Sequence, residues 1–284
     1  MIPSSCQATV HGAISIVNAI ATGKGSALGI SLKTTAKISL MKGEGKIIFQ
    51  RRNNDLFTYI IDKVIPKQIR KDNDIHLSIS SEIPIGFGLK SSSAVSSAVS
   101  LACYGLLNDE LNDFKILNTA VESCRLAKVT MTGAFDDSTA CYFGGFVLTD
   151  NYSNTLIRRE NGPEELSVII LIPNNVHRKN ILKLKSFPDL FNKAFELAEQ
   201  LDYWTAMRLN GALVSSIMSY DYEPIIASIE SGALSASISG NGPSVAAVVK
   251  EKNIDNVKVN LERYGRTFIC KVNNRKATVE KIFG

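Results

Sequence analysis

A glycine- and serine-rich segment at residues 84–94 (PIGFGLKSSSA) joins a strand-like run at 75–80 to a long helix-like stretch at 92–107. Its glycines let backbone N–H groups approach an anion closely, and the free N–H groups at a helix start add a partial positive charge. Lys90 adds a full positive charge, and the hydroxyls of Ser91, Ser92 and Ser93 can cap the helix, bind a phosphate or ligate Mg²⁺. The segment therefore predicts a phosphate-binding loop.

Two well-known phosphate-binding patterns do not describe this loop. A Walker A loop needs G-x-x-x-x-G-K-[ST], but Lys90 follows Leu89 here. The dinucleotide pattern G-x-G-x-x-G fails because Ser91 stands where the third glycine is required. A buried helix that a serine caps after a glycine turn is the alternative that needs no ligand.

Two adjacent carboxylates, Asp136 and Asp137, lie in an otherwise uncharged window at residues 133–145. Charges in such surroundings cost desolvation energy unless they serve a cation, a metal or a proton donor. An aspartate that caps the helix-like stretch at 138–143 is the alternative. Glu122, in the preceding helix-like stretch, is a third carboxylate, and either a metal role or a solvated helix face explains it.

Two further segments, taken singly, are only weak indications of a binding site. The turn at 239–244 (SGNGPS) lies between two apolar strands, where it can serve either as a plain turn or as a nest of backbone donors for an anion. Near the N-terminus, His11 and Gly12 precede a small-residue stretch at 14–27 that carries no charge apart from Lys24. Close packing against a ligand or another lobe explains this stretch, as does a tight loop beneath a sheet.

Composition indicates an ordinary globular protein: 45% of the 284 residues are hydrophobic and 21% are charged. The net charge of +5 is spread along the chain, which suits anionic small molecules or nucleic acid without deciding between them. No segment predicts a membrane span or a secretory signal, so we expect a soluble, cytoplasmic protein that does not bind membranes. The isolated cysteines, including Cys124, are expected to be small buried hydrophobes.

Patterning predicts an α+β chain of two lobes. Strand-like runs lie at 6–16, 36–40, 46–50, 75–80, 145–149, 166–172, 233–239, 245–249 and 266–272, and helix-like stretches at 56–65, 92–107, 114–128, 190–201, 203–218 and 222–231. A polar run at 150–165 predicts the boundary between an N-terminal lobe at 1–155 and a C-terminal lobe at 156–284.

The order of these segments resembles the GHMP small-molecule kinases, which include galactokinase, homoserine, mevalonate and phosphomevalonate kinases. The resemblance rests on the loop at 84–94, an aspartate ahead of Gly144 and Gly145, and the turn at 239–244. Lys90 stands at the third position of the usual Gly-Leu-Gly-Ser-Ser pattern, where the family has glycine. This variant, together with Gly-Ala-Phe-Asp-Asp and the N-terminal glycine-rich stretch, resembles the archaeal-type shikimate kinases.

The resemblance implies a two-lobed GHMP kinase fold, with an N-terminal lobe related to ribosomal protein S5 domain 2 and a ferredoxin-like C-terminal lobe. It implies that Asp137, seven residues before Gly144, is the catalytic base, and that Lys90 stabilises the charge on the transferring group. Residues implied to bind ATP and its phosphates are Pro84, Ile85, Gly86, Phe87, Gly88, Leu89, Lys90, Ser91, Ser92, Ser93, Ala94, Gly240 and Gly242. Asp136, His11 and Gly12 are candidates for substrate binding, and Ser92 and Glu122 for Mg²⁺.

The implied reaction is ATP- and Mg²⁺-dependent phosphorylation of the 3-hydroxyl of shikimate, with Asp137 accepting the proton. Shikimate carries a carboxylate, so we expect a cation to bind it, with Arg125, Lys128 and Arg178 as candidates. A homodimer is compatible with the resemblance.

Three alternatives remain at this point. The first is homoserine kinase or another GHMP kinase on the same fold, and the second is a ligand sensor that has lost catalysis. The third is a nucleic-acid-binding protein, which the absence of a continuous basic stripe with interleaved aromatic residues disfavours.

Overall fold

The computed structural model describes residues 4–50, 55–108, 110–174 and 179–283. Its larger sheet contains β1 (Ser5–Val17), β2 (Lys24–Lys42), β3 (Ile47–Phe49), β4 (Asn73–Ser81), β5 (Phe146–Asp150), β6 (Thr155–Glu160) and β11 (Thr278–Ile282). The strand order is β11-β1-β2-β4-β3, and β5 pairs with both β2 and β6. The first part of β2 pairs with β5 and its last part with β4, so one long strand connects the two parts of this sheet.

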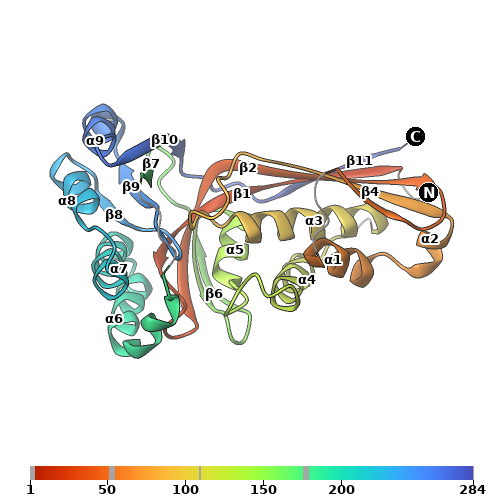
Figure 1. Cartoon of the computed structure of the whole chain (residues 1–284), viewed down its shortest axis with the longest axis horizontal. Coiled ribbons are helices and arrows are strands. Elements are labelled where there is room, and N and C mark those ends of the chain that lie inside the picture. The colour runs from red at the N-terminus through yellow and green to blue at the C-terminus, as the bar shows by residue number, and fades with distance from the viewer. Residues whose placement is uncertain (1–3, 51–54, 109, 175–178, 284) are drawn as a thin grey trace.

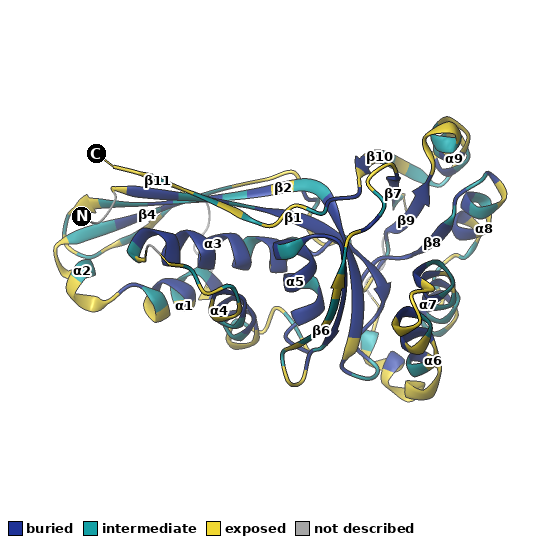
Figure 2. Ribbon diagram, turned by 180° about the vertical axis from the view of Figure 1, so that it is seen from behind, coloured by how far each residue is buried: buried dark blue, intermediate teal, exposed yellow. Residues whose placement is uncertain are grey.

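Helices cover one face of this sheet (Figure 1). They are α1 (Asp55–Val64), α2 (Lys67–Lys71), α3 (Ser91–Leu107), α4 (Asp113–Leu126) and α5 (Phe135–Phe143). Nearly all of α3 is buried (Figure 2), because its serine, alanine and glycine side chains are small enough for close contact with the sheet and with the neighbouring helices. The loop before α3 is thereby fixed to the centre of the N-terminal lobe.

The second sheet contains β7 (Ser167–Pro173), β8 (Ser235–Ile238), β9 (Val245–Val249) and β10 (Gly265–Lys271), all antiparallel in the order β10-β7-β9-β8. Its helices are α6 (Pro188–Glu199), α7 (Tyr203–Met218), α8 (Glu223–Glu230) and α9 (Ile254–Leu261), and η1 (Ile181–Ser186) and η2 (Glu251–Asn253) are short 3₁₀ turns. When the four strands are numbered 1 to 4 along the chain, their order across the sheet is 4-1-3-2, which is the arrangement expected of a ferredoxin-like lobe. The α+β, two-lobed architecture is confirmed.

The sheets divide the chain at a different place from the predicted boundary. Strand β6 begins at Thr155 and pairs with β5, so the first sheet continues beyond residue 155. Strand β11, near the C-terminus, pairs with β1 and returns the chain to the first sheet. The polar composition of residues 150–165 therefore marks an edge strand as well as a connection between lobes.

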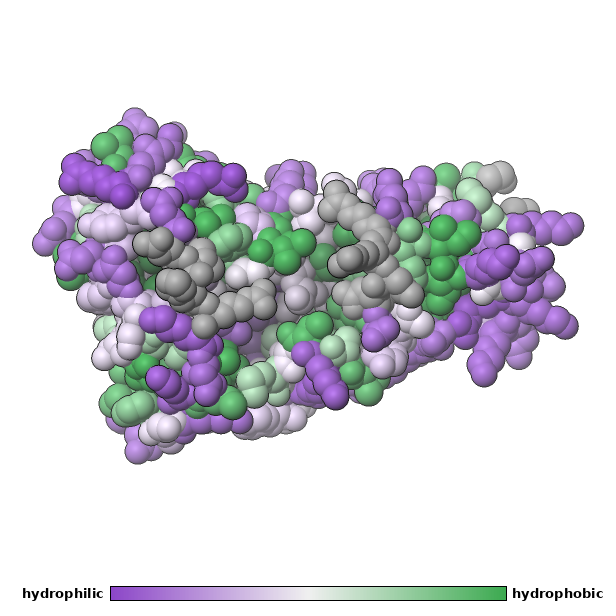
Figure 3. Space-filling view, in the orientation of Figure 1, coloured by the Kyte–Doolittle hydropathy of each residue, from purple (hydrophilic) through white to green (hydrophobic). Residues whose placement is uncertain are grey.

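All five cysteines are buried and free, as their isolated positions predict. On the face in Figure 3, hydrophilic side chains cover much of both ends of the molecule, with hydrophobic ones interspersed near the junction of the lobes. Within the described part of the chain, every helix is too short or too polar to cross a membrane.

Candidate active site

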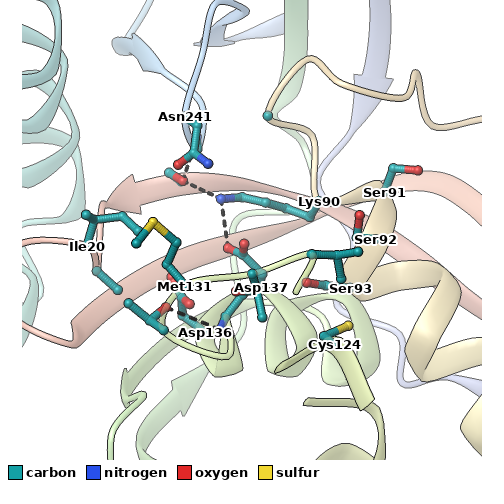
Figure 4. Close-up of a pocket in the computed structure, with 18 of the residues that line it drawn as sticks. Ile20, Lys90, Ser91, Ser92, Ser93, Cys124, Met131, Asp136, Asp137 and Asn241 are labelled. Atoms are coloured by element: carbon teal, nitrogen blue, oxygen red, sulfur yellow. Dashed lines mark hydrogen bonds and ion pairs between the residues drawn. The ribbon is translucent and has the colours of Figure 1, made fainter. Parts of the chain in front are cut away.

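A cavity of about 270 Å³ lies where five segments of the chain meet. They are the end of β1 with the turn after it, the loop at 84–90 with the start of α3, the loop between α4 and α5, the first turn of α5, and the turn between β8 and β9. Figure 4 shows Lys90 and Asp137 at the centre of these side chains, with Ser91, Ser92 and Ser93 to one side. Both lobes therefore contribute to one site.

The loop at 84–90, here called the phosphate loop, has a backbone that suits anion binding. Gly86 and Gly88 have φ angles of 89° and 75°, which favour glycine. Lys90 occupies the N-cap position of α3 in a left-handed conformation, and no side chain in the described part of the chain caps the helix. The free N–H groups of the first turn of α3 are thus available to an anion, and the alternative of a serine-capped helix is wrong.

The turn between β8 and β9 packs directly against the phosphate loop. The Ser239 hydroxyl donates a hydrogen bond to the carbonyl oxygen of Gly88 at 2.9 Å, and the Ser244 hydroxyl donates to that of Phe87. A Cβ atom on Gly88 would lie 2.0 Å from the carbonyl oxygen of Ser239, and one on Gly240 would lie 2.8 Å from that of Gly88. The two segments therefore contact each other through backbone, which only glycine allows.

Lys90 and Asp137 form an ion pair inside the cavity. The Lys90 Nζ lies 2.7 Å from Asp137 Oδ1 and donates a hydrogen bond to the Ser15 hydroxyl, also at 2.7 Å. Burial lowers the pKa of Lys90, but the charges of Asp137 and Asp136 outweigh it and raise that pKa above its ordinary value, so the ammonium stays charged. Burial and the negative charge of Asp136 raise the pKa of Asp137 to about 7, although Lys90 opposes them.

Asp136 is bound within the protein, while Asp137 faces the cavity. The Asn151 side chain donates to Asp136 Oδ1 at 2.7 Å and accepts from the Asp136 backbone N–H at 2.9 Å. A Cβ on Gly25 would lie 2.5 Å from Asp136 Oδ2, so this glycine makes room for the carboxylate. The side chain of Asp137 is 17% exposed, and Asp137 is the carboxylate that a ligand can reach.

Of the residues predicted at the phosphates, those lining the cavity are Gly86, Gly88, Leu89, Lys90, Ser91, Ser92, Ser93 and Gly240. Pro84, Ile85, Phe87, Ala94 and Gly242 are not among the lining residues. Ala94 is fully buried in α3, and a Cβ on Gly242 would contact the Tyr220 ring. These positions shape the loop and the turn without facing the cavity.

Three other candidates do not reach the cavity. Glu122 pairs with Lys63 of α1 at the surface, and Cys124, two residues further along α4, lines the cavity instead. Side chains two residues apart on a helix point to different faces, so a direct metal role for Glu122 does not agree with the structure. His11 and Gly12 lie in β1, and a Cβ on Gly12 would contact Ile83 and Ile30, away from the lining residues.

The cations proposed for the substrate carboxylate have different surroundings. The guanidinium of Arg125 donates to the carbonyl oxygens of Thr132 and Asn151 and to the Asn154 side chain, so it holds the loop after α4. Lys128 lines the cavity. Arg178 lies outside the described residues.

Several lining residues have no signal in the sequence that singles them out. Ser15 accepts hydrogen bonds from Lys90 and from the Gly240 N–H. Asn18 donates to the Gly240 carbonyl oxygen, and Ile20 and Met131 lie on the side of Asp137 away from the serines (Figure 4). Polar residues within the uncharged stretch at 14–27 are the one clue that could have indicated Ser15 and Asn18.

Comparison with known families agrees with this geometry. The model of the GHMP kinase N-terminal domain matches residues 55–145, and that of the GHMP kinase C-terminal domain matches residues 186–267. The chain belongs to the GHMP kinases. The two matches include the phosphate loop, both aspartates and the turn between β8 and β9, so ATP is the expected phosphoryl donor of this GHMP kinase.

Relatives of this GHMP kinase from archaea are named shikimate kinase. The protein from Pyrococcus furiosus is 41% identical over 248 residues, which cover 84% of this chain and 89% of the relative. The protein from Methanothrix thermoacetophila is 35% identical over 278 residues, covering 95% of this chain and 94% of the relative. The similarity therefore extends over both lobes.

Solved structures share the fold at low sequence identity. A homoserine kinase from Cytophaga hutchinsonii has a TM-score of 0.78 at 18% identity and covers 99% of this chain and 98% of its own. A mevalonate kinase has a TM-score of 0.75 at 16% identity and covers 95% of this chain and 99% of its own. At such identities the likeness establishes the fold alone.

Proposed function

We propose that this GHMP kinase transfers the γ-phosphoryl group of ATP to the 3-hydroxyl of shikimate. The observation that carries the proposal is the Lys90–Asp137 pair in a cavity beside the free N-terminus of α3. The archaeal relatives named shikimate kinase support the choice of acceptor, because their similarity covers both lobes.

The residues of the cavity fit a reaction in which positioning and charge stabilisation provide most of the rate enhancement. The N–H groups at the start of α3 and the glycines of the phosphate loop would bind phosphate oxygens. Asp137 would orient the acceptor hydroxyl and accept its proton as the bond to phosphorus forms. Lys90, held by Ser15, would keep Asp137 in place and stabilise negative charge on the transferring group.

The donors in the cavity fit Mg²⁺ bound together with ATP. Mg²⁺ prefers oxygen ligands and keeps few protein contacts in kinases, and the cavity offers the hydroxyls of Ser92 and Ser93. No cluster of three or more His, Cys, Asp or Glu side chains occurs among the described residues, so phosphate oxygens would supply much of the coordination. When bound, Mg²⁺ would neutralise charge on the phosphates.

An ADP-release assay with Mg-ATP and a panel of shikimate, homoserine, mevalonate and galactose tests the proposal. We expect turnover with shikimate and background ADP release with the other three. Turnover with homoserine or mevalonate instead would contradict the acceptor while keeping the reaction class. ATP binding without turnover of any acceptor would favour the sensor alternative.

A further inference from the structure

Lys128 is the cation of the cavity that still lacks a partner. Two cations line the cavity within the described residues, Lys90 and Lys128. Lys90 is paired with Asp137, whereas the ammonium of Lys128 has neither an ion-pair nor a hydrogen-bond partner among the side chains that the structure describes. A cation that faces a binding cavity unpaired can take an anionic group of the ligand.

The charges around Asp137 create a need for such a cation. Asp136 and Asp137 place two carboxylates at the cavity, and Lys90 balances one of them. An anionic acceptor that brings its hydroxyl to Asp137 would therefore be repelled, unless a second cation met its charged group. The guanidinium of Arg125 is engaged by the carbonyl oxygens of Thr132 and Asn151, so Lys128 is the described residue that can do this.

The backbone at Lys128 places a side chain at the cavity where glycine would be less strained. Lys128 follows the C-cap of α4 with a φ of 54°, a position where glycine is favoured. Of the six described non-glycine residues in this left-handed region, three line the cavity: Lys90, Lys128 and Ala134. Strained backbone that gathers at a cavity is typical of functional sites. A lysine that occupies a glycine position there is best explained by its ammonium.

We propose that Lys128 binds the carboxylate of the acceptor, while Asp137 takes the proton of the hydroxyl at the other end. The proposal rests on the proposed function, because it assumes an acceptor with one anionic group. It assigns the nucleotide phosphates to the start of α3 and leaves Lys128 to the acceptor.

The substitution Lys128→Gly separates binding from stability. Glycine accepts a φ of 54° without strain, so the thermal midpoint should stay the same or rise. We expect the KM for shikimate to rise about 10- to 100-fold, as the loss of a charged hydrogen bond predicts, and the KM for ATP to change by less than about 2-fold. Lys128→Arg should recover most of the affinity. Leu201→Gly, at another left-handed residue outside the cavity, is the matched backbone control and should change neither KM.

The methyl ester of shikimate tests the charge contact directly. The unaltered protein should discriminate strongly against the ester, and Lys128→Gly should use the acid and the ester about equally poorly. If Lys128→Gly raises the KM for ATP rather than the KM for shikimate, Lys128 binds a nucleotide phosphate and the proposal is overturned. The proposal is also overturned if Lys128→Gly prefers the acid over the ester as strongly as the unaltered protein does.

The panel of acceptors separates this proposal from the proposed function. If the unaltered protein uses homoserine or mevalonate rather than shikimate, the proposed function fails. The proposed role of Lys128 still predicts that Lys128→Gly raises the KM for whichever acceptor bears a carboxylate. If galactose is the acceptor and Lys128→Gly has no effect, both proposals are wrong.

Discussion

The chemistry of single residues centres on the protonation of Asp137. Its carboxylate lies beside Asp136, which is itself bound by Asn151, and it contacts Lys90 at 2.7 Å. Burial and the neighbouring carboxylate raise the pKa of Asp137 to about 7. A base must be unprotonated to accept a proton, so the rate of phosphoryl transfer should increase as the pH rises through about 7.

Substitution of Asp137 should abolish this pH dependence, and substitutions of its two charged neighbours should shift it in opposite directions. Asp137→Asn removes the base and should lower kcat about 10²- to 10⁴-fold while ATP still binds. Asp136→Asn removes a negative neighbour, so the pKa of Asp137 should fall and the acidic limb of the kcat profile should move to lower pH. Lys90→Met should move that limb to higher pH, because a favourable charge is lost. A limb at the same pH in all active variants would contradict the role of Asp137 as the titrating base.

At the scale of elements, the phosphate loop depends on its contact with the turn between β8 and β9. The contact joins the two lobes through Gly88 and Ser239, with no space for a side chain between them. The shape of the cavity at this point is therefore set by backbone from both lobes.

The substitution Gly88→Ala tests this contact. Its Cβ would lie 2.0 Å from the Ser239 carbonyl oxygen, so the loop and the turn must separate, and we expect the KM for ATP to rise about tenfold or more. Gly232→Ala is the matched control: its φ of 109° imposes similar backbone strain, the atoms nearest its Cβ position belong to the Asn253 side chain, and Gly232 does not line the cavity. Equal effects of the two substitutions, measured by ATP titration and thermal unfolding, would mean that backbone strain alone accounts for the loss.

Elements with strong periodicity could be predicted from the sequence, and those decided by tertiary contacts could not. Helix α7 has its predicted bounds, and residues of the loop at 84–90 line one cavity with Asp137, where their roles stay predictions. The first part of β2 was missed because its small residues show no alternation, and they are buried against other parts of the fold. Charged β6 was missed because it pairs at an edge. Glu122 was a wrong candidate because sequence alone did not show which face of α4 meets the cavity.

On the scale of the whole molecule, a buried amide of the C-terminal lobe positions the turn after β1. Asn210 of α7 is fully buried; its side-chain oxygen accepts from the Asn18 N–H at 2.9 Å, and its amide donates to the Ser237 hydroxyl at 3.0 Å. Asn18 in turn donates to the Gly240 carbonyl oxygen and accepts from the Ile20 N–H. The Asn210 side chain therefore links the core of the C-terminal lobe to Asn18, which the N-terminal lobe contributes to the cavity wall.

The substitution Asn210→Ala should weaken both the fold and acceptor binding. It leaves the buried Asn18 N–H and Ser237 hydroxyl without these partners, and we expect the free energy of unfolding to fall by about 2–4 kcal/mol. Because the turn at Asn18 and Ile20 loosens, the KM for the acceptor should rise more than the KM for ATP. Asn260→Ala is the control, since the side chain of Asn260 bonds, among the described residues, only to Asn256 of its own helix. This substitution should change the unfolding free energy by less than about 0.5 kcal/mol. Urea titration and steady-state kinetics measure the two effects; a stability loss with both KM values unchanged would confine Asn210 to the packing of the C-terminal lobe.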